Sequence, residues 1–462
     1  MNTPGTPASS SAPTNLLSPR SPMIAILPWG DFIEDFLDTI GVSLEEFSST
    51  MTGGWLFGYV EALRLQGIRS TIFCFSKHVQ ATVYSVHHGT GAGIVMLRAS
   101  SIYQKIRKHL SDPYGMTVEQ MFGDTRGLAY QARRLMYPVV PFLATPVISL
   151  AGAIRRAGCN AILCQEYETP RFDASIAIGK LLRIPVFATY QGGNWQRSKL
   201  ERTLRPLTLR RSAGIIIGPS MEVARVRARY GVPAKKIASI FNPLNLSEWR
   251  PGSQLRARRN LEIPEGTRVA IWHGRIDMHT KGLDILLAAW KEVSSLRNGQ
   301  DSLLMVIGSG RDAEKFGEDI LSMGVPQIRW IQEYVLDRAA MREYLNAADV
   351  YVFPSRHEGF AVAPLEAMAC GLPIIAAAAS GISDVLAEGE EHGGIVVPIN
   401  DPQSLAHTVV RLLDDHEFCR LLGSRARARA EKVFSLESVG AQLFDFLQTR
   451  GGLKPQPSAA AI

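Results

Sequence analysis

One stretch decides the architecture of this chain: Pro354-Ser355-Arg356-His357-Glu358-Gly359-Phe360-Ala361-Val362-Ala363-Pro364-Leu365-Glu366-Ala367-Met368-Ala369-Cys370-Gly371-Leu372-Pro373. A short, β-rich apolar run at 350–353 comes directly before it and predicts a buried strand. Pro364 is typical of the first turn of a helix, and Gly371 and Pro373 are typical of its end. The stretch therefore predicts a strand, a glycine-bearing loop and a helix, followed by a new strand at 374–376.

Two carboxylates in this stretch are separated by seven residues, with Glu358 in the loop and Glu366 in the first helical turn. Both are expected to face one crevice at the carboxyl end of the strand. A helix N-terminus beside a glycine-bearing loop suits a phosphate group or a sugar hydroxyl. Acids also favour first helical turns because of the helix dipole, so Glu366 alone is open to a purely structural interpretation.

The spacing Glu358-x7-Glu366 within PSRHEGFAVAPLEAMACGLP resembles the nucleotide-sugar signature of retaining glycosyltransferases of family 4. This resemblance is close over residues 210–435 and looser over the first half of the chain. It implies an α/β protein with the GT-B fold, in which two Rossmann-like domains with parallel sheets face an interdomain cleft.

Size and composition agree with a two-domain globular protein. The chain has 462 residues, which is more than a single hydrophobic core usually holds together. Of these residues, 46% are hydrophobic and 20% are charged, as is typical of a globular protein. No apolar run approaches the ~20 residues that a membrane span needs. Five scattered cysteines without metal spacing favour reduced thiols and a cytoplasmic location, in a chain that is peripheral to the inner face of the membrane if it contacts the membrane.

The net charge of +7 is typical of proteins that bind nucleic acid, an anionic membrane or an anionic small substrate. Nucleic acid is not expected, because the sequence has no RNP-like, helix-turn-helix or zinc pattern. Basic residues gather beside apolar ones between 102 and 136. That pattern is typical of a solvated helix face and also of a surface that touches anionic lipid.

The order of apolar runs sets the expected domains. Residues 1–22 are rich in Ser, Pro and Thr and predict a disordered tail. An N-terminal, acceptor-side Rossmann-like domain is expected over 23–245, and a C-terminal nucleotide-sugar-binding domain over 246–435. The resemblance implies that a helix over 436–450 crosses back to the first domain, and a flexible tail is expected over 451–462.

Candidate residues in the first domain lie in two glycine-bearing loops. Gly53 and Gly54 precede a helical pattern, where glycine lets the backbone approach a ligand or simply make a tight turn. The resemblance places this loop near the donor diphosphate and the acceptor. Gln191 follows a predicted strand where the family commonly has a histidine. Its amide can hydrogen-bond a hydroxyl but cannot take a proton.

Two cations are expected at a strand end of the second domain. Gly274 and Arg275 follow the apolar run 269–272, and Lys281 comes five residues later. Arg275 offers a planar donor fork and Lys281 a compact charge for a diphosphate. Two surface cations are the alternative interpretation, but GR-x5-KG before the glutamate motif matches the family's diphosphate clamp.

The resemblance implies roles for these residues. Glu366 would bind the ribose hydroxyls and Glu358 the donor sugar, with Glu358, Arg275 and Lys281 as the catalytic set. The backbone around Gly359, Phe360, Ala361 and Leu365 would meet the phosphates and the sugar, and the backbone after 328–332 would hold the base. No metal or other cofactor is expected beside the nucleotide-sugar co-substrate, because the cations can offset leaving-group charge.

Together with these residues, the resemblance implies a retaining hexosyltransferase that uses a nucleotide-diphosphate sugar and a saccharide or lipid-linked acceptor, in polysaccharide or glycolipid biosynthesis. The alternative is a degenerate member of the same fold that binds the donor without turnover. Gln191 and Asp384 favour that alternative. The segment 380–384 stands where relatives often have two glycines and a glutamate, so Asp384 either serves in place of that glutamate or simply caps a helix. A nucleotide-sugar epimerase or Rossmann oxidoreductase lacks support, because no GxGxxG follows the first strand.

Overall fold

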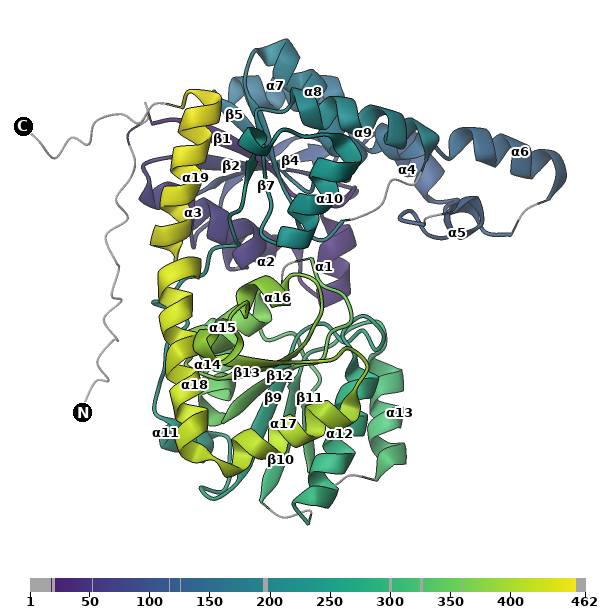
Figure 1. Ribbon diagram of the computed structural model, residues 1–462. Helices are drawn as coiled ribbons and strands as arrows, with labels where there is room; N and C mark the ends of the chain where they lie inside the picture. The colour runs from purple at the N-terminus through teal and green to yellow at the C-terminus, as the bar shows by residue number, and fades with distance from the viewer. Residues whose placement is uncertain are drawn as a thin grey trace, which may run out of the picture.

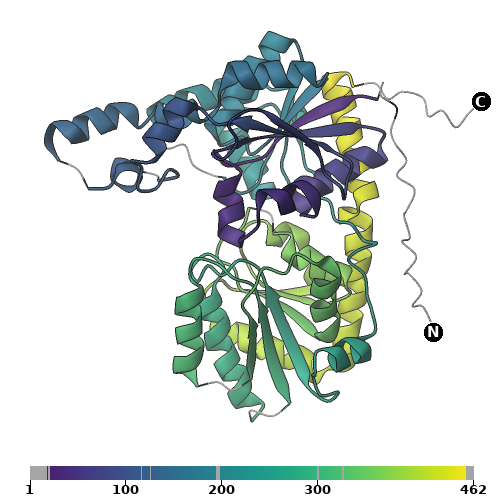
Figure 2. The same cartoon turned by 180° about the vertical axis from the view of Figure 1, so that it is seen from behind.

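The computed structural model describes residues 18, 21–51, 53–115, 117–124, 126–193, 198–298, 301–324, 327–359 and 361–453. Within these ranges the strands form two sheets, each covered by helices (Figures 1 and 2). This arrangement confirms the predicted α/β class with two Rossmann-like units.

The first sheet holds eight strands among the described residues, in the order β3-β4-β2-β1-β5-β6-β7-β8. The pairs are parallel except for β3 and β4, which are antiparallel at one edge. Its strands are β1 (Met23–Leu27), β2 (Arg69–Ser76), β3 (Val83–Val86), β4 (Gly93–Arg98), β5 (Ala161–Gln165), β6 (Val186–Thr189), β7 (Gly214–Ile216) and β8 (Ile237–Ala238).

The helices of this half are α1 (Glu34–Ile40), α2 (Leu44–Ser49), the π-helix η1 (Gly54–Gly58), α3 (Tyr59–Leu65), α4 (Ser101–Arg107), α5 (Val118–Phe122), α6 (Gly127–Met136), η2 (Val140–Ala144), α7 (Val147–Arg156), α8 (Pro170–Leu182), α9 (Lys199–Arg211), α10 (Ser220–Tyr230) and η3 (Ala234–Lys236). Side chains alternate across each strand, so Ile24 and Ile26 pack in one core and Ala25 and Leu27 in the core on the other face. The central strands are therefore apolar on both faces, as parallel sheets between helices require.

The second sheet is wholly parallel, with six strands in the described residues in the order β11-β10-β9-β12-β13-β14. These strands are β9 (Arg268–His273), β10 (Ser302–Ile307), β11 (Ile328–Ile331), β12 (Val350–Phe353), β13 (Ile374–Ala377) and β14 (Gly394–Val397). The helices are α11 (Gln254–Asn260), α12 (Leu283–Leu296), α13 (Ala313–Met323), α14 (Arg338–Ala347), α15 (Ala363–Ala369), α16 (Ile382–Val385), η4 (Gly389–His392), α17 (Pro402–Asp414), α18 (His416–Arg429), η5 (Ala430–Phe434) and α19 (Leu436–Gly451).

The deciding stretch folds as its pattern predicts. Strand β12 is buried along its whole length, and helix α15 has its proline in the first turn and its buried face in the core. Strand β12 lies beside β9 in the sheet, so the loops that follow these two strands open at the same edge. That edge faces the first domain (Figure 1).

Both ends of the described chain pack more closely than the predicted tails. Ser21 is buried and its carbonyl accepts a hydrogen bond from the Arg69 guanidinium, so the tail predicted over 1–22 is wrong at its last two residues. Helix α19 packs on α3 of the first domain, and Leu453 is buried in the first-domain core. The tail predicted from 451 is therefore wrong for 451–453. The predictions for 1–17, 19–20 and 454–462 lie outside the described residues.

Candidate functional site

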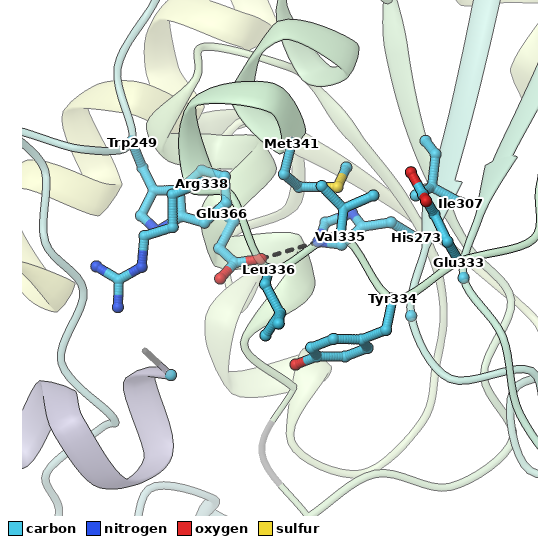
Figure 3. Close-up of a pocket in the computed structure, with 13 residues that line it drawn as sticks. Trp249, His273, Ile307, Glu333, Tyr334, Val335, Leu336, Arg338, Met341 and Glu366 are labelled. Carbon is cyan, nitrogen blue, oxygen red and sulfur yellow. Dashed lines mark hydrogen bonds and ion pairs between the residues drawn. The ribbon is translucent and has the colours of Figure 1, made fainter. Parts of the chain in front are cut away.

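A cavity of about 110 Å³ lies where the second sheet meets the first domain (Figure 3). Strand β9 contributes its last residue, the loop after β11 contributes a continuous wall, and Gly53 comes from the first domain. The lining residues are Gly53, Trp249, His273, Gly274, Ile307, Gly308, Glu333, Tyr334, Val335, Leu336, Arg338, Met341 and Glu366. The cavity thus combines Gly53, Gly274 and Glu366, three residues that the sequence predicts.

Glu366 points into this cavity from the first turn of α15 and contacts a histidine that the sequence analysis did not single out. The His273 Nε2 and Glu366 Oε2 atoms are 2.8 Å apart (Figure 3). The other ring nitrogen of His273 is buried and has no hydrogen-bond partner among the described atoms. His273 therefore fixes the orientation of the Glu366 carboxylate while leaving the second carboxylate oxygen available.

Arg338 is a second cavity residue that sequence reasoning missed. It is the first residue of α14 and forms an ion pair with Glu248. Burial lowers the pKa of Arg338, while Glu61 of the first domain and Glu366 act in the opposite direction. The guanidinium stays charged, because an arginine pKa lies far above neutral pH. A cation therefore lies within the electrostatic range of Glu366.

Lys281 and Glu358 are paired with each other in the structure. The Lys281 Nζ donates to Glu358 Oε1 at 2.7 Å, and the glutamate is buried. Lys281 precedes Gly282, which has φ +63° and caps α12. A Cβ at Gly282 would come 2.1 Å from the carbonyl oxygen of Pro354, so only glycine lets this turn pack against the deciding stretch.

Arg275 lies in a neighbouring cavity of about 680 Å³. This cavity also opens between the domains, with Asp38, Ile40 and Gly41 of the first domain on its wall. Glu333 and Tyr334 line both cavities, so Arg275 and Glu366 occupy adjoining spaces. The structure thus pairs Lys281 with Glu358 and Glu366 with His273. The exposed side chain of Arg275 lies in the adjoining cavity.

The predicted backbone contacts follow the loop after β12. Gly359 and Ala361 are partly exposed, Leu365 is buried in the core through its side chain, and Phe360 lies outside the described residues. Gly359 lies against Gly192 of the first domain. A Cβ at Gly359 would come 2.1 Å from the Gly192 Cα, and Gly192 has φ +114°. Two glycines are therefore required for the two domains to touch here.

Gln191 uses its side-chain amide within the protein. Its Nε2 donates to Thr189 Oγ1 at 3.0 Å and to Asn242 Oδ1 at 3.3 Å, and its Oε1 accepts from Asn242 Nδ2 at 3.2 Å. Tyr59 of α3 also donates to Asn242 Oδ1, at 3.0 Å. Gln191 therefore joins its own loop to the segment that leaves the first sheet. Gly54 begins the π-helix η1 that leads into α3.

Glu166, directly after β5, is a third residue that the sequence analysis missed. Its Oε2 accepts from the backbone nitrogens of Gly193 at 2.7 Å and Gln191 at 3.1 Å, and its Oε1 accepts from the Glu168 nitrogen at 2.9 Å. Glu166 itself has φ +98°, which is rare for a residue with a side chain. Burial raises the pKa of Glu166 to about 7, against the opposing effect of these N–H donors.

Asp384 links the domains at another point. Its Oδ2 accepts from the backbone nitrogen of Ser220, the first residue of α10, at 3.1 Å. Asp384 is thereby engaged with the first domain. Within the described residues no group of three or more His, Cys, Asp or Glu side chains is arranged to hold a metal ion.

Comparison with known proteins matches part of the second domain to a described family. Residues 267–415 match the family described as Glycosyl transferases group 1. The D-inositol 3-phosphate glycosyltransferase of Thermobifida fusca is 26% identical over 217 residues, which cover 46% of this chain and 49% of that protein. The chain thus spans about half the length of the curated relatives it matches.

Two solved structures show the same fold over nearly the whole chain. Sucrose-phosphate synthase from Thermosynechococcus elongatus superposes with a TM-score of 0.67 at 20% identity, covering 93% of this chain and 98% of that one. The Anabaena HepE protein in complex with UDP gives 0.63 at 14% identity, covering 92% and 100%. These similarities confirm the predicted GT-B fold.

Proposed function

We propose that this chain, whose residues 267–415 are a glycosyl transferases group 1 domain on a GT-B fold, transfers a hexose from a nucleotide-diphosphate sugar to a saccharide or lipid-linked acceptor. One observation carries the proposal. The adjacent parallel strands β9 and β12 end beside two carboxylates with basic partners, Glu366 with His273 and Glu358 with Lys281, at an edge lined by both domains.

The donor would lie across this edge. Glu366 would accept hydrogen bonds from the ribose hydroxyls, because His273 occupies one of its oxygens and leaves the other free. Lys281 would exchange Glu358 for the diphosphate, and Glu358 would then accept from hydroxyls of the sugar ring. Arg275 would reach the diphosphate from the adjoining cavity. The loop after β11 would hold the base through its backbone.

Transfer with retention of configuration fits the first domain. The amide of Gln191 cannot take a proton, and both carboxylate oxygens of Glu166 already accept backbone hydrogen bonds. The acceptor hydroxyl would therefore give its proton to a phosphate oxygen of the departing nucleotide. The bond from C1 to that phosphate breaks, and the bond from C1 to the acceptor oxygen forms on the same face.

We further propose that the reaction needs no metal or other cofactor and takes place in the cytoplasm. Lys281 and Arg275 supply positive charge for the leaving diphosphate. The five cysteines are free and buried, in keeping with a reducing compartment. Addition of a chelator is expected to leave the transfer rate unchanged, and a loss that magnesium restores would contradict a metal-free transfer.

The test begins with donor binding. Thermal unfolding is measured with UDP-, GDP- and ADP-sugars, since a donor that binds the folded chain raises its unfolding temperature. The HepE structure contains UDP, so UDP-sugars are tested first. The donor that binds is then incubated with oligosaccharides and lipid-linked saccharides, and the anomeric configuration of the product is read by NMR. Inverted product would contradict retention.

Two negative outcomes have different meanings. Failure of every nucleotide-sugar to bind would contradict the proposed function. Donor binding with neither transfer nor donor hydrolysis would instead support the degenerate binding protein, for which Gln191 and the engagement of Asp384 with Ser220 are the structural arguments.

A further inference from the structure

Helices α5 and α6 project from the side of the first domain, and both views show α6 lying away from the rest of the molecule (Figures 1 and 2). Helix α6 spans Gly127–Met136 and has no buried residue. A ten-residue helix is marginal by itself in water and usually owes its stability to burial of an apolar face. The way in which α6 orients its two faces is therefore informative.

The polar face of α6 is the one that packs. Arg133 Nη1 donates to the carbonyl oxygen of Phe122 at 2.8 Å, and its guanidinium lies 5.8 Å from the Phe122 ring centroid. Tyr130, three residues earlier, lies close enough to Glu119 on α5 for that carboxylate to raise the pKa of the Tyr130 hydroxyl. Tyr130 and Arg133 are also the two partly covered residues of the helix. Helix α5 thus takes the face that water would normally solvate.

The apolar face of α6 is left to solvent. Leu128 and Leu135 are seven residues apart, which places them on one side of the helix, and they are 84% and 77% exposed. Met136 is 41% exposed and Ala132 is exposed between the two leucines. Single exposed leucines are common on protein surfaces, but an aligned apolar stripe on a projecting helix is not. We call Leu128, Ala132, Leu135 and Met136 the α6 stripe.

Two exposed cations lie close in sequence to the α6 stripe. Arg126 lies just before the helix and Arg134 within it; both are exposed, and the helix contains no acid. An apolar stripe with arginines beside it matches the pattern of helices that lie in the plane of a bilayer surface. A second copy of the chain would bring like charges together over only two helical turns, which is far below the area of a stable protein interface.

We propose that the α6 stripe, with Arg126 and Arg134, docks on an anionic lipid surface. The leucines and Met136 enter the boundary between headgroups and acyl chains, and the arginines contact the phosphates. Docking does not depend on the proposed function. Within the described residues no single helix is long and apolar enough to cross a membrane; a pair bent by 56°, α6 with Val140–Arg156, passes on length and composition alone.

The test is cosedimentation of the full chain with vesicles of phosphatidylcholine alone or mixed with phosphatidylglycerol. Binding is expected to require the anionic lipid and to weaken with salt. The double variant Leu128→Ser/Leu135→Ser is expected to bind at least about tenfold more weakly, because two large apolar groups no longer enter the lipid. Arg126→Gln/Arg134→Gln is expected to lose about fivefold for each arginine.

Matched controls lie on the second domain. Leu321 on α13 is 82% exposed, so Leu321→Ser removes an equally accessible leucine, and Lys315→Gln/Arg420→Gln removes two exposed cations. All of these sites are exposed, so thermal unfolding is expected to stay unchanged. Equal binding by wild type and the α6 variants, equal losses in the controls, or no binding by wild type would each overturn the proposal. A dimer that disappears in Leu128→Ser/Leu135→Ser would also overturn it and assign the stripe to a second copy.

Discussion

The loop after β12 and the loop after β6 touch at Gly359 and Gly192, yet they are organised in different ways. In the second domain, the loop's own side chain Glu358 forms the ion pair with Lys281. In the first domain, Glu166 accepts hydrogen bonds from the backbone N–H groups of Gln191 and Gly193. The loop after β12 carries its functional groups on side chains, and the loop after β6 presents a backbone surface that is held by a residue directly after β5.

The residues that support the two loops differ as well. Helix α15 packs against apolar residues in the core of the second domain. Glu168, two residues after Glu166, belongs to a buried charged network. Arg225 contacts Glu168 at 2.5 Å and Glu222 at 2.6 Å, and Tyr230 donates to Glu168 at 2.7 Å. Residues on the donor side are therefore expected to act by direct contact with the substrate, and Glu166 by positioning the loop after β6.

The largest effect is expected at Lys281. Lys281→Ala removes the charge nearest to Glu358 and is expected to lower the transfer rate by two or more decades, about 3 kcal/mol of transition-state stabilisation. The rate is measured at saturating donor. Lys315→Ala, an exposed lysine on α13, is the control and is expected to have no effect. Retained activity in Lys281→Ala would contradict the proposed contact between the lysine and the diphosphate.

Donor affinity tests whether Glu366 contacts the donor directly. Glu366→Ala is expected to weaken donor affinity about tenfold or more, since a hydrogen bond to a charged group contributes about 1.5–3 kcal/mol. His273→Phe leaves the carboxylate in place without its 2.8 Å partner and is expected to have a smaller effect. Calorimetric titration measures both. Glu333→Ala alters another acid of the same cavity wall and is the control. Unchanged affinity in Glu366→Ala would contradict its ribose role.

Glu166→Gln tests positioning. The amide keeps the shape of the carboxylate but offers one acceptor oxygen in place of two, so at least one backbone N–H loses its partner. An unsatisfied buried N–H group costs about 1–3 kcal/mol, so the loop after β6 is expected to hold its shape less well. The transfer rate is therefore expected to fall about tenfold through changes in the acceptor KM and in kcat, while the affinity for the nucleotide-sugar stays unchanged. A fall in donor affinity as large as that in Glu366→Ala would contradict a positioning role and make the two loops alike.

The same variant gives a pH test of Glu166. Its pKa is raised by burial from the ordinary 4.5 to about 7, so the unfolded chain loses this proton first as the pH rises. Wild-type stability is therefore expected to fall relative to Glu166→Gln between about pH 4.5 and 7, by up to about 3 kcal/mol. Chemical denaturation of both proteins at several pH values measures this difference. A constant difference across that range would contradict the raised pKa.

The contrast between the loops also explains how much the sequence predicts. Strand β12, the loop, Pro364 and Glu366 follow one another within twenty residues, so a local pattern carries both the fold and the acids. Glu166 acts on nitrogens 25 and 27 residues away, and its sequence neighbours look like an ordinary strand end. Its role therefore depends on the β5–β6 crossover, which a local pattern does not contain. The one available signal was a polar run directly after an apolar strand.

Arg338 and α6 show two other limits. Arg338 reaches the cavity because α14 directs it toward Glu248, which is 90 residues away in the chain. The basic and apolar residues of α6 predict an amphipathic helix, and only packing against α5 shows that the apolar side is the exposed one. Periodicity gives the faces of a helix but not their partners.

The smallest effect is expected at Asp384, where the two domains are joined away from both loops. Its carboxylate accepts a single hydrogen bond, from Ser220 at 3.1 Å, at a partly exposed position. Such a bond contributes about 0.5–1.5 kcal/mol, so Asp384→Ala is expected to change donor KM or kcat no more than about tenfold through a less favoured closed state. Asp384→Asn keeps an acceptor oxygen and is expected to restore most of the loss. Steady-state kinetics of both variants decides between two roles. A loss of two decades in Asp384→Ala would mean that Asp384 contacts the donor directly and that the donor site extends to α16.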